Sequence, residues 1–107
     1  MSNRLFQGVI HQMKDSIDRT FGVIDENFTV IACSSLGKIG ETIEAFTITP
    51  NELIVSEGNT YKSLSSSQGA NYVVFVEGED LLASKYTSVL AVPIFSAKSS
   101  SVPVYPP

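Results

Sequence analysis

Apolar residues over the first twenty positions of the chain recur with the period of an α-helix. At about 100° per residue they fall within one arc, and charged and polar residues take the opposite side. The arc consists of Leu5, Phe6, Val9, Ile10, Met13 and Ile17. The pattern predicts an amphipathic helix over residues 2–20 that lies across one face of a sheet. Because the arc is wide, the same helix can also contact a second chain.

Five later runs are rich in β-branched and aromatic residues, which is the composition of β-strands. These runs are residues 21–25, 28–34, 52–57, 60–66 and 71–77. Short connections at Glu26-Asn27 and Gly58-Asn59 predict two antiparallel hairpins, because such links are too short for a parallel crossover. The last run, NYVVFVE, is apolar at consecutive positions and is expected to be a central strand covered on both faces.

Two segments connect the predicted hairpins. Residues 35–40 are expected to form a loop in which Gly37 and Gly40 allow backbone angles that other residues resist. Residues 41–46, ETIEAF, show a short apolar period that predicts one or two helical turns, with Pro50 as a boundary soon after. A short middle helix is therefore expected between the second and third strands.

The C-terminal part of the chain allows two interpretations. Residues 80–95 predict a helix that loses its regularity near Pro93, because proline is unfavourable both inside a helix and in a central strand. Residues 89–95, VLAVPIF, can instead form a strand. Residues 96–107 are rich in serine and proline and are expected to be a linker or loose tail, which places the domain at residues 1–95.

Composition and charge exclude several classes of function. The 107 residues suffice for one domain, and 43% of them are hydrophobic and 17% charged, as in an ordinary folded protein. The net charge is −4 and the seven basic residues are scattered, which argues against direct contact with nucleic acid or an anionic membrane. The chain has no apolar run near the roughly 20 residues of a membrane helix, no signal-peptide pattern and only one cysteine. A cytoplasmic protein is expected.

The predicted order of elements is helix, strand, strand, short helix, three strands, helix. This is the order of a PAS-like (profilin-like) α+β domain, in which helices flank a five-stranded antiparallel sheet. We therefore expect such a sheet with an N-terminal helix, a short middle helix and a C-terminal helix. In such a fold, a small ligand would occupy the cavity between the sheet and the short helices.

A stretch of the chain resembles a known family of sensor domains. Residues 17–41, IDRTFGVIDENFTVIACSSLGKIGE, are similar to the N-terminal sensor segment of bacterial carbohydrate-diacid regulators and of related PucR-type transcription regulators. In that group a helix ending in D-R-T leads to a hairpin with a turn after D-E, an I-I-A-S-type strand and an R-I-G or K-I-G loop. The matching residues here are Asp18, Arg19, Thr20, Asp25, Glu26, Ile31, Ala32, Ser34, Lys38, Ile39 and Gly40. Residues 73–92 resemble the last strand and exit helix of the same group.

The resemblance implies a regulatory domain of a transcription regulator that senses a small molecule, a carboxylate or sugar acid, and forms a homodimer. The N- and C-terminal helices are the expected dimer contacts. The family continues into a helix-turn-helix DNA-binding region, and no part of this chain is expected to form one. Diacid-binding members tend to carry a His-Glu-Gly-type stretch after the loop, whereas this chain has ETIEAF from Glu41 to Phe46, so the identity of the ligand stays open.

Seven residues are candidates for ligand binding: Arg19, Ser34, Ser35, Lys38, Ile39, Gly40 and Tyr72. The loop at residues 37–40 can offer backbone amides and the Lys38 ammonium to a carboxylate, or it can be a structural turn with a solvated lysine. Arg19 can bind an acid through its forked guanidinium, or it can complement the dipole at the end of the first helix. The two serines can bind a ligand or cap the following turn. Tyr72 can be a pocket wall or part of the core.

The residues typical of catalytic and metal sites are scarce. Cys33 is expected to pack as a small apolar residue, and His11 lies opposite the apolar arc and is expected to be solvated. We therefore expect no enzyme and no metal or other cofactor. The alternative to a sensor is a GAF-like or profilin-like interaction scaffold with a filled core, which a strand at residues 89–95 would favour.

Overall fold

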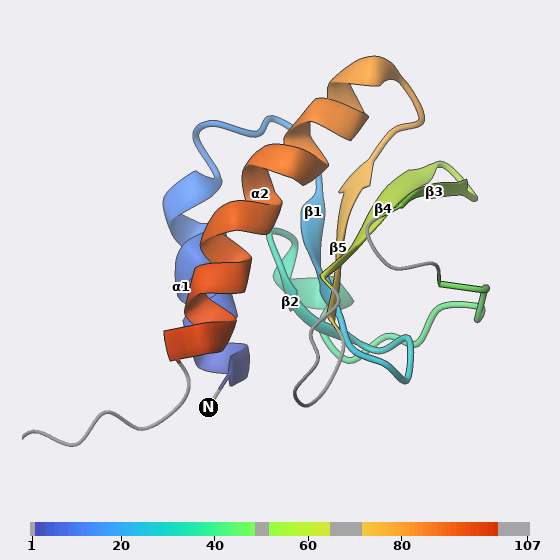
Figure 1. Ribbon diagram of the computed structural model, residues 1–107. Helices are drawn as coiled ribbons and strands as arrows, with labels where there is room; N and C mark the ends of the chain where they lie inside the picture. The colour runs from blue at the N-terminus through green and yellow to red at the C-terminus, as the bar shows by residue number, and fades with distance from the viewer. Residues whose placement is uncertain (1, 49–51, 65–71, 101–107) are drawn as a thin grey trace, which may run out of the picture.

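The residues that the structure describes form a five-stranded antiparallel sheet with two α-helices against one of its faces (Figure 1). The computed structural model describes residues 2–48, 52–64 and 72–100. The elements are α1 (Ser2–Met13), β1 (Phe21–Ile24), β2 (Val30–Cys33), the 3₁₀ turn η1 (Leu36–Lys38), β3 (Leu53–Ser56), β4 (Asn59–Leu64), β5 (Tyr72–Glu77) and α2 (Leu81–Ser100). The strand order is β2-β1-β5-β4-β3. The predicted α+β class and five-stranded antiparallel sheet are confirmed.

Strand β5 lies at the centre of the sheet, between β1 and β4, as its apolar sequence predicts. Its side chains alternate between the two faces, and four consecutive residues are buried. Val74 and Val76 belong to the core beneath the helices, whereas Val73 and Phe75 belong to a second core on the opposite face. Burial on both faces explains why this strand lacks the alternating polar positions of an exposed one.

The helical layer supplies the larger of the two cores. Phe6 and Ile10 of α1 and Leu90 and Ile94 of α2 are fully buried, and they pack with Phe21 and other apolar side chains of the sheet. These helical residues recur at spacings of three to four, so each helix turns one face to the strands. Both helices lie on the same side of the sheet in Figure 1.

A glycine in β1 allows two neighbouring strands and an aromatic ring to come close. Gly22 pairs with Cys33 of β2 and with Phe75 of β5. A Cβ atom at this position would lie 2.9 Å from the Cys33 Cα and 3.0 Å from the Phe75 ring, and it would also overlap the Ala32 carbonyl oxygen. The missing side chain therefore lets Phe75 lie over β1 on the face opposite the helices.

On the face opposite the helices, the predicted helix at residues 41–46 does not form. The segment is extended: Thr42 forms an isolated β-bridge with Thr29, and the Ile43 amide donates to the Phe28 carbonyl at 2.9 Å. Its β-branched residues favour this conformation, and pairing with the chain before β2 satisfies its backbone. Ile43 and Phe46 pack against the second core, so an extended segment covers this face where a helix was expected.

The two α-helices also differ from their predicted bounds. Helix α1 ends at Met13 instead of residue 20, although Ile17 beyond it is still buried. Helix α2 continues through Pro93 to Ser100, so the expected loss of regularity near Pro93 is wrong, as is the alternative strand at residues 89–95. Burial of Leu90 and Ile94 against the sheet outweighs the unfavourable proline. Of the expected tail at 96–107, the first five residues are helical, and 101–107 lie outside the described residues.

The turn between β3 and β4 is shifted by one residue from its predicted position. Its central residues are Glu57 and Gly58, with φ of 53° and 83°. Positive φ at both central positions is the requirement of a two-residue hairpin turn whose twist matches that of the strands. The outer ends of two predicted strands, at residues 65–66 and 71, lie outside the described residues.

Candidate functional site

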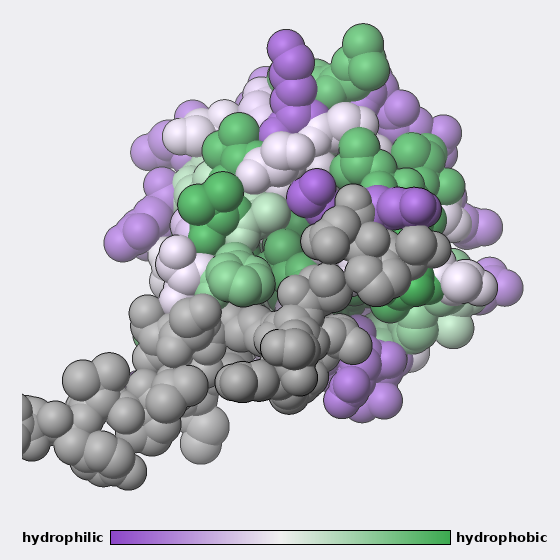
Figure 2. All heavy atoms as spheres, in the orientation of Figure 1, coloured by the Kyte–Doolittle hydropathy of each residue, from purple (hydrophilic) through white to green (hydrophobic). Residues whose placement is uncertain are grey.

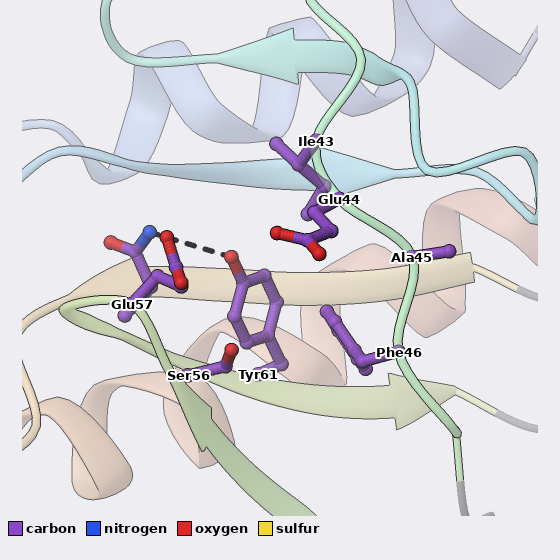
Figure 3. A pocket seen from close by; sticks show the side chains of 8 residues that line it. Ile43, Glu44, Ala45, Phe46, Ser56, Glu57 and Tyr61 are labelled. Carbon is purple, nitrogen blue, oxygen red and sulfur yellow. Dashed lines mark hydrogen bonds between the residues drawn. The ribbon is translucent and has the colours of Figure 1, made fainter.

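A pocket opens on the face of the sheet opposite the helices, between the extended segment at residues 41–48 and the β3–β4 hairpin (Figure 3). We call it the sheet-face pocket. It has a volume of about 480 Å³, which falls within the range of small-molecule sites. It is lined by Ile43, Glu44, Ala45, Phe46, Ser56, Glu57, Asn59 and Tyr61.

Aromatic rings form one wall of the sheet-face pocket. The ring centroids of Phe46 and Tyr61 are 4.7 Å apart with their planes tilted by 54°, and Phe28 packs edge-on against Phe46 at 5.1 Å. Tyr61 in turn lies 6.2 Å from Phe75, which rests on Gly22. The second core thus supports this aromatic wall. The wall is a preformed apolar surface, as is common in ligand sites.

The polar groups of the pocket come from both of its sides. In Figure 3 the Glu44 carboxylate points from the extended segment toward the Tyr61 hydroxyl, and Glu57 stands on the opposite side at the hairpin turn. The Asn59 side-chain amide donates to the Tyr61 hydroxyl oxygen at 3.4 Å. Tyr61 is only 4% exposed, so its ring is largely covered, and its hydroxyl lies at the pocket wall. The pocket therefore combines two carboxylates, an amide and a phenol above an aromatic surface.

A small cavity, which we call the extension, adjoins this pocket on the side of the loop after β2. It has a volume of about 50 Å³ and shares Ile43, Asn59 and Tyr61 with the sheet-face pocket. Its further wall includes Lys38 and Glu41. One of the predicted ligand residues, Lys38, is exposed and lines a cavity that sequence reasoning did not locate.

Three backbone amides of the loop at residues 37–40 are already used within the fold. The Lys38 amide donates to Ser35 at 3.1 Å, the Ile39 amide to Leu36 at 3.2 Å, and the Gly40 amide to Val30 at 2.8 Å. Gly40 has a φ of 96°, which glycine adopts readily. These three amides are therefore engaged with backbone carbonyls, and the group that the loop supplies to the cavity is the Lys38 side chain.

Arg19 lies at the end of the sheet where β1 begins and β5 ends, and it pairs with a carboxylate of the protein. Its Nη1 and Nη2 atoms donate to the two carboxylate oxygens of Asp80 at 2.5 and 2.8 Å. Nη1 also lies 3.4 Å from the Glu77 carbonyl oxygen. The hydrogen bonds from Arg19 hold the pKa of Asp80 well below its usual range. In this arrangement the guanidinium joins parts of the chain to one another.

The two predicted serines lie near Arg19, around a shallow hollow of about 330 Å³ at this end of the molecule. We call it the end hollow; its charged lining residues are Lys14, Asp18, Arg19 and Glu77. The Ser34 hydroxyl accepts a hydrogen bond from the Phe21 amide at 3.0 Å, and the Ser35 amide lies 3.4 Å from the Cys33 sulfur. Ser34 thus joins the end of β2 to the start of β1, and Ser35 belongs to the turn that follows β2.

Tyr72 lies in a third place, on the helical side of the sheet. Its ring meets the edge of Phe6 at 4.9 Å, within the core beneath the helices. Ile39 is half exposed, on the loop after η1. The seven predicted residues are therefore distributed over the end hollow, the loop beside the sheet-face pocket and the helical core, and the structure does not bring them together in one site.

The remaining reactive residues do not add a second chemical centre. Cys33 is fully buried, and burial raises the pKa of its thiol, which keeps it protonated. His11 is exposed on α1, as its place opposite the apolar arc predicts. Within the described residues, no three His, Cys, Asp or Glu side chains form a group that could hold a metal ion. Neither described helix has the length and apolar content needed to cross a membrane.

Comparisons with protein-family models, with curated proteins and with solved structures return no match to this chain.

Proposed function

We propose that this chain is the sensing and dimerising domain of a transcription regulator. The observation that carries the proposal is the sheet-face pocket, a cavity of about 480 Å³ with an aromatic wall and convergent polar groups. Pockets of this size and composition are the default ligand sites of small domains. The regulatory context is supported by the resemblance of residues 17–41 to the sensor segment of PucR-type regulators.

A carboxylate is the ligand group that Lys38 would bind. Its ammonium is a compact point charge on a flexible stem, and it lines the extension of the pocket. A small acid that entered the sheet-face pocket could place its carboxylate in this extension and its carbon chain against Tyr61 and Phe46. Ligand selectivity would then depend on the groups at the wider part of the pocket.

Dimerisation is proposed to use the outer surface of the helical layer. A groove of about 580 Å³ between α1 and α2 is lined by Leu5, Gly8 and Val9 on one side and Pro93 on the other. Val89 and Val92 on α2 are 54% and 68% exposed, and Leu5 is 39% exposed. Figure 2 shows apolar side chains among polar ones over the face that carries the helices. A dimer formed through this surface would cover the exposed apolar side chains of both helices.

The proposal is tested by thermal unfolding against a panel of small acids that includes glycerate, glucarate, galactarate, succinate and glutarate. A ligand that binds the folded state must raise the melting temperature, by an amount that grows with ligand concentration above Kd. Each acid is also tested at raised salt, because non-specific charge effects weaken there. A rise for one or two acids that Lys38→Met abolishes supports a carboxylate sensor.

The second candidate function is an interaction scaffold without a ligand. It is favoured by the exposed apolar residues of α2, which do not depend on the sheet-face pocket. Absence of any ligand-dependent rise in melting temperature, together with a stable dimer, would favour the scaffold over the sensor.

A further inference from the structure

We infer that the ligand of the sheet-face pocket carries a positively charged nitrogen, held between Glu44 and Glu57 above the aromatic wall. The inference rests on the proposed function, since it takes the sheet-face pocket as the ligand site. It goes beyond that function by assigning a second ligand charge, opposite in sign to the carboxylate that Lys38 would hold.

The charge of the cavity supports this assignment. The acidic residues at the sheet-face pocket and its extension are Glu41, Glu44 and Glu57, whereas Lys38 is the basic residue in these linings. Neither Glu44 nor Glu57 forms an ion pair with a residue that the structure describes. A purely anionic ligand would therefore be repelled at the wider part of the cavity, where a cation would be attracted.

The two carboxylates approach the same space from separate segments. Glu44 extends from the segment that covers the sheet, and Glu57 stands at the hairpin turn on the opposite side of the Tyr61 ring (Figure 3). The turn does not require a carboxylate at position 57, because asparagine or glycine adopts the positive φ of this position as readily. The convergence of the two carboxylates on one cavity is a property of the tertiary structure.

The wall between the carboxylates suits a cation. Phe46 lines the pocket and is only partly buried, so its ring offers aromatic surface to an ammonium or guanidinium group, and Tyr61 packs against it with centroids 4.7 Å apart. The Tyr61 hydroxyl lies at the pocket wall, and its one hydrogen bond to a described residue is the contact in which it accepts from Asn59. Its own proton is thus available to an acceptor atom of a ligand.

A cationic nitrogen can come from two sources, a zwitterionic amino acid or a plain amine. An amino acid would place its carboxylate toward Lys38 and its ammonium toward Glu44 and Glu57. A plain amine or diamine would use the two glutamates and the rings alone. The Lys38→Met variant distinguishes these sources. It should weaken the binding of an amino acid and leave the binding of a plain amine unchanged or tighter.

The test compares matched pairs of compounds that differ by one amino group. Aspartate is compared with succinate and glutamate with glutarate, and arginine, putrescine and glycine betaine extend the set. Binding is measured by the rise in melting temperature and then by calorimetric titration. We expect the amine-bearing member of a pair to bind at least tenfold more tightly. Glu44→Gln and Glu57→Gln should each weaken that binding about two- to fivefold, as expected for exposed charge pairs.

Glu26→Gln is the matched control, because Glu26 is exposed in the β1–β2 connection and does not line the cavity. Equal binding of both members of each pair, or binding that the two glutamine variants leave unchanged, overturns the inference. Tighter binding of the deaminated acids overturns it as well and leaves the proposed acid sensor standing. Failure of every compound, acids and amines alike, overturns both proposals.

Discussion

Arg19 and Asp80 form a two-pronged ion pair that joins the connection between α1 and β1 to the beginning of α2. The two N–O distances are 2.5 and 2.8 Å, and Asp80 Oδ1 also accepts from the Ala83 amide at 3.2 Å, as an N-cap residue does. Gly78 has no side chain where the guanidinium lies. The arginine of the D-R-T motif therefore has a structural partner 61 residues further along the chain.

Removing the charge of Asp80 should destabilise the protein in a pH-dependent way. Because the ion pair lowers the pKa of Asp80 in the folded state, its stabilising contribution is present above the unfolded-state pKa, about 4. It is lost as the pH falls from there through the lowered pKa. We expect Asp80→Asn to have a lower melting temperature than the wild type at pH 7, with a difference that narrows below about pH 4.

Asparagine is the suitable replacement because it keeps the capping oxygen for the Ala83 amide and removes only the charge. Thermal unfolding of both proteins at a series of pH values measures the effect. A difference in melting temperature that stays constant down to pH 2 would contradict a charge-based role for Asp80. Asp80→Ala, which also removes the cap, should be less stable than Asp80→Asn at pH 7.

A side chain at position 22 should disrupt the centre of the sheet. In Gly22→Ala the new Cβ would meet the Cys33 Cα at 2.9 Å and the Phe75 ring at 3.0 Å. We expect a loss of about 2 kcal/mol or more in the free energy of unfolding, as for other overpacked cores. Denaturant unfolding measures it. Gly37→Ala is the control, because no atom lies within 4 Å of that Cβ, and an equal loss in both variants would contradict the steric account.

Much of the sheet could be predicted from sequence because its signals are local. The alternation of residues and the short links of the two hairpins depend on neighbours in the chain, and the consecutive apolar residues Val73, Val74 and Phe75 directly reflect burial on both faces. The segment at residues 41–46 was predicted wrongly because Ile43 and Phe46, three residues apart, fit one face of a helix. Its pairing with Thr29 is a longer-range contact that the segment itself does not reveal.

The candidate site was largely beyond prediction for the same reason. Its walls bring Glu44 and Phe46 against Glu57 and Tyr61, and nothing in either segment alone indicates that they meet. Lys38 was identified through the K-I-G loop, yet the amides expected to act with it donate to Ser35, Leu36 and Val30. Arg19 matched the family motif, but its pairing with Asp80 depends on the folded sheet, in which the start of β1 lies beside the end of β5.

Replacing the proline inside α2 should stabilise the protein. Pro93 has no amide proton, so the Val89 carbonyl lacks its usual partner one turn later, and the ring crowds that carbonyl. We expect Pro93→Ala to raise the free energy of unfolding by about 1 to 3 kcal/mol. Pro93→Gly restores the same amide but adds backbone entropy, so its gain should be about 1 kcal/mol smaller. Denaturant unfolding of the three proteins checks both values, and a loss of stability in Pro93→Ala would mean that the proline itself is needed at the groove between the helices.

A charge on the outer surface of α2 should separate the proposed dimer. Val92 is 68% exposed and follows Val89 by one helical turn on the outer surface of α2. A lysine there would place an unpaired ammonium within the interface, which we expect to weaken dimerisation by about tenfold or more. Sedimentation equilibrium over a range of protein concentrations measures the monomer–dimer constant.

Leu36→Lys provides the control for this variant. Leu36 is 69% exposed, similar to Val92, but it lies on η1, away from the groove between the helices. The two substitutions introduce the same charge at positions of similar exposure. A general effect of added charge on the monomer–dimer constant would therefore appear in both variants. Dissociation in Val92→Lys alone places the interface on the helical layer. A wild type that stays monomeric at every concentration would contradict the proposed dimer. A dimer that both variants leave intact would show that the helices do not form its interface, because Val92→Lys changes the apolar surface that they expose.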